Sequence, residues 1–521
     1  MIPQQSLAIL LSSSLLLYLV FNLIKFLHKV WWTPFRIQSL MASQGIKGPP
    51  YKFFYGNTKA IIGMSCESIS KPMDYLSHDI FSYVLPHQSS WFNKYGMNFL
   101  FWLGPQASLV VSELELFKEI LNDKDKTYPK PDTQAYVKRL IGDGLVVTSN
   151  GEKWAKMRKL ANYAFHAESL KNMIPAMVSS VEMMIERWRN QEGKEIEVFE
   201  EFRLLTSEVI SRTAFGSSYT EGKKIFDMLR KLTVIMSRNG LKVPLPVISK
   251  IYKSRDEVEA DKLEKGIRES VSEIIKKREE KVRTGKTKDF GSDFLGVLVE
   301  AYHEEDQFKK ISLEELIDEC KTFYVAGQET TNSLLAWIIM ILAIHTDWQE
   351  EARKEVLMIF GQENPSYHGI TRLKMMSMII NETLRLYPPA LGVVRKTSRE
   401  ARLGNLTLPA GIHLLVPILA LHHDSSIWGE DAHLFKPERF SEGVAKATNN
   451  NINAYIPFGT GPRICVGFDF VITEAKIALS MILQSYNFTL SPAYVHSPHL
   501  VFTLRPQHGV QVILHSLKSE D

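Results

Sequence analysis

The residue patterns of this chain predict a mainly α-helical protein with a small β-rich region and one apolar segment at its N-terminus. Helical patterns prevail from Glu152 onward, and the longest regions cover residues 167–283 and 312–344. Short runs of β-branched and aromatic residues between Lys94 and Ser112 predict a small sheet. With 521 residues, the chain is long for one domain but suits a large enzyme with a single core.

The composition excludes several classes of protein. Hydrophobic residues make up 45% and charged residues 23% of the chain, which is ordinary for a globular protein. The net charge is +4, and the densest basic run, residues 276–288, alternates with acidic residues. This alternation favours a solvated helix end, and we expect no nucleic-acid partner. Three scattered cysteines, Cys66, Cys320 and Cys465, exclude a disulfide framework and suit a reducing compartment.

The N-terminal run of residues 6–24 is almost wholly apolar and long enough to cross a bilayer. A cleavable signal peptide is the alternative. However, no basic residues precede the run, and large residues such as Trp31 and Trp32 follow it where a cleavage site would need small ones. Lys25 and Lys29 lie just after the run, so the positive-inside rule keeps the C-terminal side in the cytosol. We therefore expect an uncleaved, single-pass signal anchor in the endoplasmic reticulum membrane.

Three parts of the chain follow from this interpretation: a transmembrane signal anchor (1–30), a linker with a proline-rich hinge (31–50) and a globular domain (51–521). Gly48-Pro49-Pro50 forms the hinge because proline breaks helices. The glycosylation patterns at Asn381, Asn405 and Asn487 should be coincidental, since a cytosolic domain never meets the transferase.

Shorter signals divide the globular part further. The connector around residues 244–246 (Val-Pro-Leu-Pro-Val from Val243) is apolar and proline-broken, and it suits a packed surface loop and a membrane-dipping loop equally well. Ser312 and Glu315 predict a capping box at the start of the helix 312–344. Residues 390–395 and 414–421 have the patterns of strands.

The stretch 458–467, FGTGPRICVG, carries the clearest chemistry. Glycines serve where a chain turns tightly or where a flat group approaches the backbone, and successive N–H groups in such a loop can converge on one anionic atom. Arg463 adds a fixed positive charge suited to a carboxylate. A thiolate at Cys465 beside this arginine describes an axial ligand of a haem whose propionates need neutralising. The alternative is a buried, inert cysteine in a glycine-rich turn.

This stretch resembles the haem-binding loop of the cytochrome P450 family, F-G-x-G-x-R-x-C-x-G, at every fixed position. The resemblance implies that Cys465 is the thiolate ligand of a haem b iron and that Arg463 binds a propionate. The other fixed positions of the cofactor loop are Phe458, Gly459, Gly461 and Gly467.

The predicted helix 312–344 contains a second unusual stretch, AGQETT, at residues 326–331. Glycine costs about 1 kcal/mol relative to alanine inside a helix, and threonine hydroxyls can distort the preceding turn, so the stretch points to function. It resembles the family's oxygen-binding motif, A-G-x-[DE]-T-[TS]. Gly327 would then leave room over the iron, Thr330 would hold the proton network at dioxygen, and Glu329 would supply protons. A small-residue patch for tight packing is the alternative.

Three further motifs complete the resemblance. Trp154 and Arg158 share one face of a predicted helix and match the family's W-x-x-x-R helix along the haem edge. Glu382, Arg385 and, in a later P-E-R-F stretch, Arg439 resemble the family's buried structural triad. Arg395 is a candidate for the second propionate partner. His422, His423 and Asp424 lack further ligands at metal-like spacing, and we expect them to be surface and supporting polar groups.

The motifs run in the family's order, so the resemblance covers the whole globular part and makes residues 51–521 a haem-thiolate catalytic domain. It implies a mainly α fold with a smaller β-rich region on the N-terminal side. It also implies a monooxygenase that activates O₂ reductively and inserts oxygen into a C–H bond. Electrons would come from NADPH through cytochrome P450 reductase, with cytochrome b5 as a further donor. Lys153 and Lys156 are candidates for meeting the reductase's acidic surface.

The overall pattern is most similar to the plant clan of hormone- and terpenoid-modifying members. It implies a hydrophobic small-molecule substrate such as a terpenoid, a steroid-like hormone or a fatty acid, and no residue selects among them. Two rivals remain: a haem-thiolate isomerase or dehydratase acting on hydroperoxides, and a haem sensor without turnover. Intact Thr330 and Glu329 argue against the first.

Overall fold

The computed structural model of the protein describes residues 4–123, 126–149, 151–243 and 253–517. Its contacts divide the chain into two compact units. The first unit comprises Met1–Cys66, Pro86–Pro129 and Val394–Val416, and the second comprises Glu67–Leu85, Lys130–Val393 and Pro417–Asp521. The predicted fold class is confirmed, since most elements are helices and the strands are few and short.

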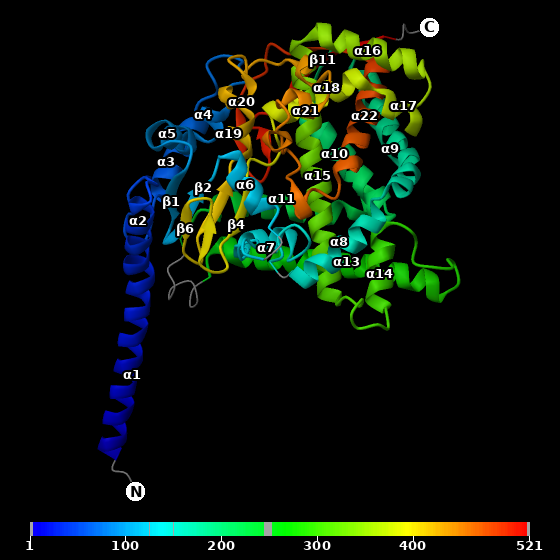
Figure 1. Cartoon of the computed structure of the whole chain (residues 1–521). Coiled ribbons are helices and arrows are strands. Elements are labelled where there is room, and N and C mark those ends of the chain that lie inside the picture. Colours follow the sequence, from blue (N-terminus) through cyan, green and yellow to red (C-terminus); the bar gives the residue numbers. More distant parts are fainter. Residues whose placement is uncertain (1–3, 124–125, 150, 244–252, 518–521) are drawn as a thin grey trace. The chain divides into compact units, whose positions relative to one another are not determined.

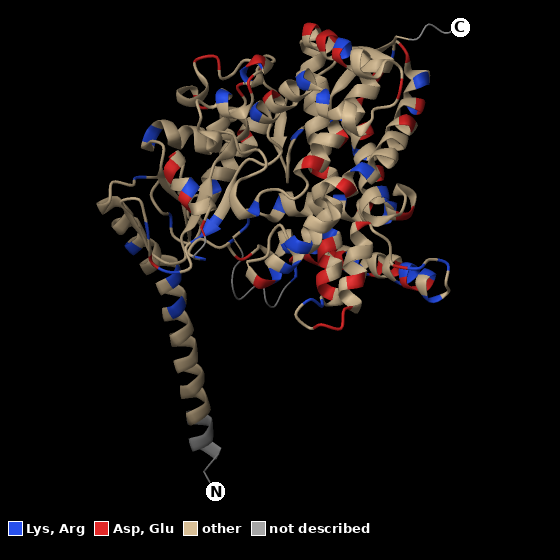
Figure 2. Cartoon of the chain, turned by 45° about the vertical axis from the view of Figure 1, so that its right-hand side comes forward, with Lys and Arg blue, Asp and Glu red and all other residues tan. Residues whose placement is uncertain are grey.

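The first unit begins with a long helix that contains the apolar run. The helix consists of α1 (Gln4–Leu27), a π-helical turn, η1 (His28–Trp32), and α2 (Thr33–Ser43). Residues 10–43 form the one helix, among the described residues, that is long and apolar enough to span a membrane, with a mean hydropathy of 1.9 and none of its apolar window buried. Figure 2 shows that basic residues appear on α1 only toward its C-terminal end.

Most of the segment 31–50, expected to be a linker, is helical. Pro34 lies within this continuous helix, directly after the π-helical turn. The Val30 carbonyl, which an N–H at position 34 would contact in a regular α-helix, accepts the Tyr51 hydroxyl instead. The helix ends at Ser43, and Gly45 follows with φ +83°. The non-helical connection therefore covers only residues 44–50, which include Gly48-Pro49-Pro50.

A four-stranded sheet of order β1-β2-β7-β4 forms the centre of the first unit (Figure 1). The hairpin of β1 (Phe99–Leu103) and β2 (Gln106–Val110) lies in the region where we expected a sheet. Strand β2 pairs in parallel with β7 (His413–Val416), and β4 spans Val393–Lys396. The predicted strand 414–421 is wrong in its second half. Pro417 cannot donate to a ladder, and helix α19 (Ile418–His422) follows it.

The other elements of the first unit are short. They are α3 (Thr58–Ile69, whose last turn enters the second unit), α5 (Pro86–Tyr95), α6 (Leu114–Leu121) and the hairpin of β5 (Ala401–Leu403) and β6 (Leu406–Leu408).

Helix α15 (Leu313–Ile344) is the core element of the second unit and packs against α10 (Val198–Phe215). Its predicted capping box is present: Ser312 Oγ accepts the N–H of Glu315 at 3.1 Å, and the Glu315 carboxylate accepts the N–H of Ser312 at 2.8 Å. Nearly all residues from Leu316 to Ala343 are buried, as expected of a helix surrounded by other elements.

Besides α15, the second unit contains α22 (Phe468–Ser485) and a further set of helices. They are α4 (Phe81–Val84), α7 (Ala135–Ile141), α8 (Gly151–Ala164), α9 (Ala167–Trp188), α11 (Tyr219–Asn239), α13 (Arg255–Arg283), α14 (Phe294–His303), α16 (Thr346–Phe360), α17 (Tyr367–Arg372), α18 (Lys374–Leu386), α20 (Ser425–Trp428) and α21 (Val444–Ala447). Short 3-10 turns are η2 (Arg189–Gln191), η3 (Pro437–Phe440), η4 (Ile452–Ala454) and η5 (Gly461–Arg463).

Two small sheets complete the second unit. One has the order β3-β11-β8, from Glu195–Glu197, Gln511–Ser516 and Tyr486–Leu490, and the other pairs β9 (Pro498–Leu500) with β10 (Leu504–Pro506). The connector at residues 244–246 lies outside the described residues, between α11 and α13.

Candidate active site

The loop 458–467 forms an open turn in front of α22. Gly459 and Gly461 have φ values of +73° and +74°, which side-chain-bearing residues rarely adopt. A Cβ placed on Gly459 would meet nothing within 4 Å. The backbone N–H of Cys465 donates to the carbonyl of Phe458 at 2.9 Å and closes the turn. The loop therefore presents an exposed cysteine on a backbone with open space beside it.

Three influences act on the Cys465 thiol. The surrounding protein raises its pKa by desolvation, although the residue is exposed on one side. The backbone N–H of Gly467 and the positive charge of Arg158 lower the pKa. Because a thiolate is the form that ligates metals, these two groups are the ones that favour ligation.

Helix α8 lies against this loop through the two expected residues. The guanidinium of Arg463 lies 4.7 Å from the ring centroid of Trp154, and its Nη1 donates to the Thr148 carbonyl at 3.1 Å. Arg158 donates from Nη1 to the carbonyl of Ile464. The structure thus brings Trp154, Arg158, Arg463 and the cysteine loop together, and the cation–π contact orients the Arg463 side chain.

One narrow face of α15 is accessible in the middle of this otherwise buried helix. Between Leu316 and Ala343, only Ala326, Gly327 and Thr330 are not buried. These positions are one and four residues apart, so they share one side of the helix. The Thr330 hydroxyl donates to the Ala326 carbonyl at 2.7 Å. The hydroxyl oxygen keeps its lone pairs, so it can still accept a hydrogen bond.

Gly327 has a different surrounding from the expected one. A Cβ at this position would lie 2.7 Å from Cδ1 of Ile210 on α10. The structure therefore gives Gly327 a packing reason, namely the close approach of α10 and α15. Its expected role of leaving room over an iron stays a prediction.

Glu329 points to another side of α15. Its side chain is buried and lines a cavity between α10, α11, α15 and β10, not the accessible face. Desolvation raises the pKa of its carboxyl group, while the charges of Arg505 and Arg203 lower it.

The Glu382–Arg385–Arg439 residues form a buried charge cluster. Arg385 donates from Nε and Nη2 to the two carboxylate oxygens of Glu382, both at 2.8 Å, and both side chains are fully buried. Arg439 Nε lies 3.5 Å from Glu382 Oε1. The cluster continues toward the cysteine loop, because Arg385 Nη1 donates to the His422 carbonyl at 2.8 Å and His422 Nε2 accepts the N–H of Ile456 at 3.1 Å.

His422 is therefore a supporting residue, whose burial and contacts the sequence did not predict. We expected it to be a surface or supporting polar group, but its side chain is fully buried and holds the backbone just before the loop. Burial lowers the pKa of its imidazole to about 3, so the ring is neutral and its Nε2 can accept. The histidine pair in the sequence was a signal, but the partner is 34 residues away.

Arg395 and the two lysines of α8 have the following surroundings. Arg395 belongs to the first unit, where it is buried in β4 and donates to the Val394 carbonyl at 3.0 Å, and burial lowers its pKa to about 10. Lys153 is only 15% exposed and lies 3.5 Å from Asp143, while Lys156 donates to the Lys310 carbonyl. Lys153 is thus less available to a partner than we expected.

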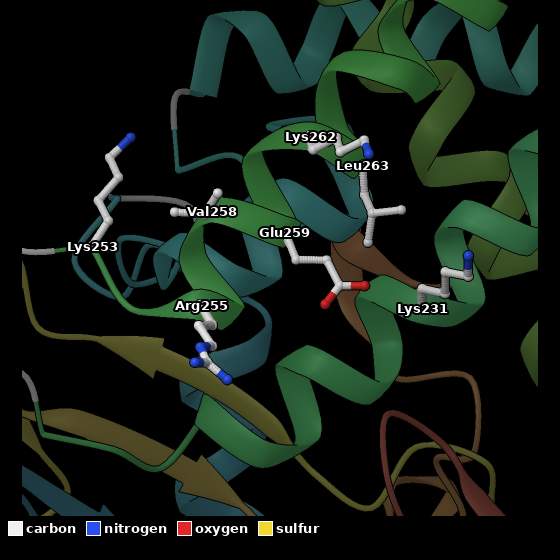
Figure 3. A pocket seen from close by; sticks show the side chains of 7 residues that line it. All are labelled: Lys231, Lys253, Arg255, Val258, Glu259, Lys262 and Leu263. Atoms are coloured by element: carbon white, nitrogen blue, oxygen red, sulfur yellow. The ribbon is translucent and has the colours of Figure 1, made fainter.

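A pocket between two helices of the second unit contributes nothing to this site. It has a volume of about 500 Å³ and lies between α11 and α13 (Figure 3). Its lining is Lys231, Lys253, Arg255, Val258, Glu259, Lys262 and Leu263, and none of the expected site residues is among them.

The residues of the second unit fit a haem. An exposed cysteine stands on a glycine turn, two arginines and a tryptophan flank it, and the central helix of the same unit has an accessible threonine face. Thiolate ligation with cationic partners for the propionates is typical of haem-thiolate proteins.

The family model described as Cytochrome P450 matches residues 84–513. The chain therefore belongs to the cytochrome P450 family and is a monooxygenase of the oxidoreductase class. Membership implies a haem with a cysteine thiolate ligand, a redox partner and a hydrophobic substrate.

Several curated plant relatives match along nearly the whole chain. Cytochrome P450 CYP749A22 of Panax ginseng is 59% identical over 508 residues, covering 97% of each chain. An 11-oxo-beta-amyrin 30-oxidase of Glycyrrhiza uralensis is 43% identical over 507 residues, covering 94% of each. Cytochrome P450 734A1 of Arabidopsis thaliana is 37% identical over 508 residues, covering 96% of this chain and 95% of the relative.

Proposed function

We propose that this chain is a membrane-anchored monooxygenase that inserts one oxygen atom of O₂ into a hydrophobic small molecule, with electrons from NADPH through cytochrome P450 reductase. The observation that carries the proposal is the presence, within one compact unit, of the exposed Cys465 and the accessible Thr330 face of α15. A terpenoid is the substrate class we favour, because one relative oxidises 11-oxo-beta-amyrin. Steroid-like hormones and fatty acids are the other classes.

Cys465 would hold the iron, and Arg463, with Trp154 and Arg158 beside it, would hold a propionate; Arg395 is proposed for the second propionate. When bound, the haem supplies reductive activation of O₂. The chain's own contribution is to place a proton donor and acceptor nearby. The Thr330 hydroxyl donates a hydrogen bond to the Ala326 carbonyl at 2.7 Å, and this bond fixes the orientation of the hydroxyl group. Its oxygen can still accept a hydrogen bond from a proton donor. The buried Glu329 is the group in this stretch that can exchange a proton.

The buried cluster of Glu382, Arg385 and Arg439 has a structural role in this proposal. Through the His422 carbonyl and the His422 ring it fixes residue 456, two positions before the loop begins. The loop can then keep its open form without being held by the cofactor alone.

We also propose the location of the enzyme. The helix 10–43 anchors it once in the endoplasmic reticulum membrane, and the basic residues Lys25, Lys29 and Arg36 keep the catalytic part in the cytosol. Cytosolic exposure is what a reductase, and cytochrome b5 as a further donor, would require.

A reconstituted assay tests the function. The purified full-length protein with NADPH and a plant reductase is given terpenoids related to beta-amyrin, sterols and fatty acids, and binding is followed by the spin-state shift of the haem. We expect product formation that depends on both NADPH and O₂. Rearrangement of hydroperoxides without reductase would identify an isomerase, and the absence of NADPH oxidation with every substrate would contradict a monooxygenase role.

A further inference from the structure

A small polar cavity lies beside Glu329, on a different side of α15 from the accessible face. Its volume is about 30 Å³, enough for one or two waters, since one water needs about 10–15 Å³. Its lining comes from four elements: α10, α11, α15 and β10. Polar lining residues include Gln328, Glu329, Asn332, Arg203 and Arg505.

Two side chains in this cavity lack partners. Within the described part of the chain, neither Nε2 of Gln328 nor Oδ1 of Asn332 forms a hydrogen bond, although both residues are more than nine-tenths buried. A buried polar atom without a partner costs about 1–3 kcal/mol. A water in the cavity can accept from Gln328 and donate to Asn332 and Glu329, which satisfies all three groups.

Arg505 is held in position by its own backbone. The carbonyl of the preceding residue, Leu504, accepts hydrogen bonds from the Ser333 hydroxyl and, at 3.2 Å, from the indole N–H of Trp337 on α15. The Leu504 N–H donates to the Pro389 carbonyl at 3.0 Å. Strand β10 is therefore fixed against α15 one residue before Arg505, which lines the cavity.

The cations around the cavity differ in how they are engaged. Arg203 on α10 is occupied by Glu200, with Nε 2.8 Å from Oε2. Arg230 on α11 is exposed. Among the described residues, Arg505 forms no ion pair with a carboxylate, and its charge acts on Glu329 and on His499, its partner across β9. Arg505, which is half-buried, is thus the cation of the cavity lining that remains as a partner for Glu329.

We propose that Arg505 is a positioning residue that, with one or two ordered waters in this cavity, holds Glu329 ready to exchange a proton in the proposed reaction. The proposal rests on the proposed monooxygenase function. A proton arrives through the cavity water and binds the Glu329 carboxylate, and the same carboxyl group releases one proton toward the Thr330 side. Glu329 then returns to its starting form, and the net result is the transfer of one proton.

The first test follows the protonation of Glu329 itself. Infrared spectra of the resting holoenzyme are recorded against pH, and the carboxyl band of Glu329 is assigned by its loss in Glu329→Gln. Removing a nearby opposite charge should move the titration midpoint upward by about 1 pH unit or more in Arg505→Gln. Arg505→Lys, which keeps the charge, should stay near the wild type. Arg255→Gln, an exposed arginine on α13, is the matched control.

The second test concerns turnover. We expect Arg505→Gln to release more peroxide per NADPH and to show a solvent isotope effect on product formation that differs from the wild type, with the Lys variant restoring both. A wild-type titration midpoint in a folded Arg505→Gln protein would overturn the proposal. If that variant does not fold, Arg505→Met, which also removes the charge but keeps a long side chain, takes its place, and a wild-type midpoint in Arg505→Met would overturn the proposal. Failure of the proposed function itself would be separate, since the wild type would then form no product while the infrared shift could still appear.

Discussion

Arg385 donates from its guanidinium to the carbonyl oxygen of His422 at 2.8 Å, while the ring of the same histidine accepts the N–H of Ile456 at 3.1 Å. A fully buried ion pair is thereby connected to Ile456, two positions before the cysteine loop. The ion pair of Glu382 and Arg385 and the conformation of the loop are therefore linked. A mutation in the ion pair should change the conformation of the loop, and a mutation in the loop should change the stability of the ion pair.

Replacing Glu382 with Gln should destabilise the protein strongly. The change leaves the buried Arg385 without a counter-charge, and breaking a buried pair typically costs about 3–5 kcal/mol. Urea unfolding followed by fluorescence measures the change, and haem retention should fall with it. Glu168→Gln is the control, because its partner Lys171 lies 2.7 Å away on the surface and exposed pairs contribute little. Equal stability of the two variants would refute the structural role of the cluster.

Cys465→His should abolish the thiolate signature of the reduced carbon monoxide complex and give the spectrum of histidine ligation, because the imidazole replaces the sulfur as ligand. Cys66→Ser is the matched control, since Cys66 is the other exposed cysteine. A thiolate spectrum that persists in Cys465→His would remove this residue as the ligand.

Thr330→Val should uncouple the reaction. The shape is kept, so haem and substrate should still bind, but the hydroxyl on the accessible face of α15 is lost. One well-placed hydrogen bond is worth about 1–3 kcal/mol, or roughly tenfold to a hundredfold in partitioning. Product and peroxide are measured per NADPH oxidised.

The neighbouring Thr331 supplies the control for this experiment. It is fully buried, and within the described residues its hydroxyl has no hydrogen-bond partner. Thr331→Val should therefore leave coupling unchanged. Unchanged coupling in both variants would leave Thr330 with a packing role alone.

Stability should fall as the pH decreases below about 6.5. Burial lowers the pKa of His78 and His422 to about 3 and that of His496 to about 4 in the folded protein. In the unfolded chain the histidines have pKa values near 6.5, so between pH 6.5 and the lowered pKa the unfolded chain binds more protons than the folded protein. Each buried histidine therefore lowers the free energy of unfolding by about 1.4 kcal/mol per pH unit as the pH falls through this range. Urea unfolding at pH 7 and pH 5 measures the slope, and His496→Gln should make it shallower. An identical slope in this variant would contradict the assignment.

The full-length protein should remain in the membrane pellet after carbonate extraction and show no mobility shift with a glycosidase. The exposed apolar helix 10–43 and the basic residues after its apolar run are the reasons. Release of the full chain into the supernatant would contradict the anchor, and glycosylation at Asn381, Asn405 or Asn487 would contradict the orientation.

Local features of this molecule were predictable from the sequence, and distant ones were not. The capping box of Ser312 and Glu315 involves residues three apart, so the start of α15 could be found from the pattern alone. The cysteine loop likewise carries its identity in ten consecutive residues. The role of His422 depends on Ile456, and the packing of Gly327 depends on Ile210, more than a hundred residues earlier. The local pattern of apolar and polar residues does not predict contacts between residues so far apart in the sequence.

The parallel pairing of Ser108 on β2 with His413 on β7 has a consequence for biosynthesis. Some three hundred residues must be made after one strand before its neighbour exists. During translation the β1–β2 hairpin therefore keeps an open edge, and open edges are prone to wrong pairing. Pairings so distant in sequence form slowly, so the sheet can close only when the chain is nearly complete. We therefore expect the nascent protein to depend on chaperones during this interval more than its mainly helical composition would suggest.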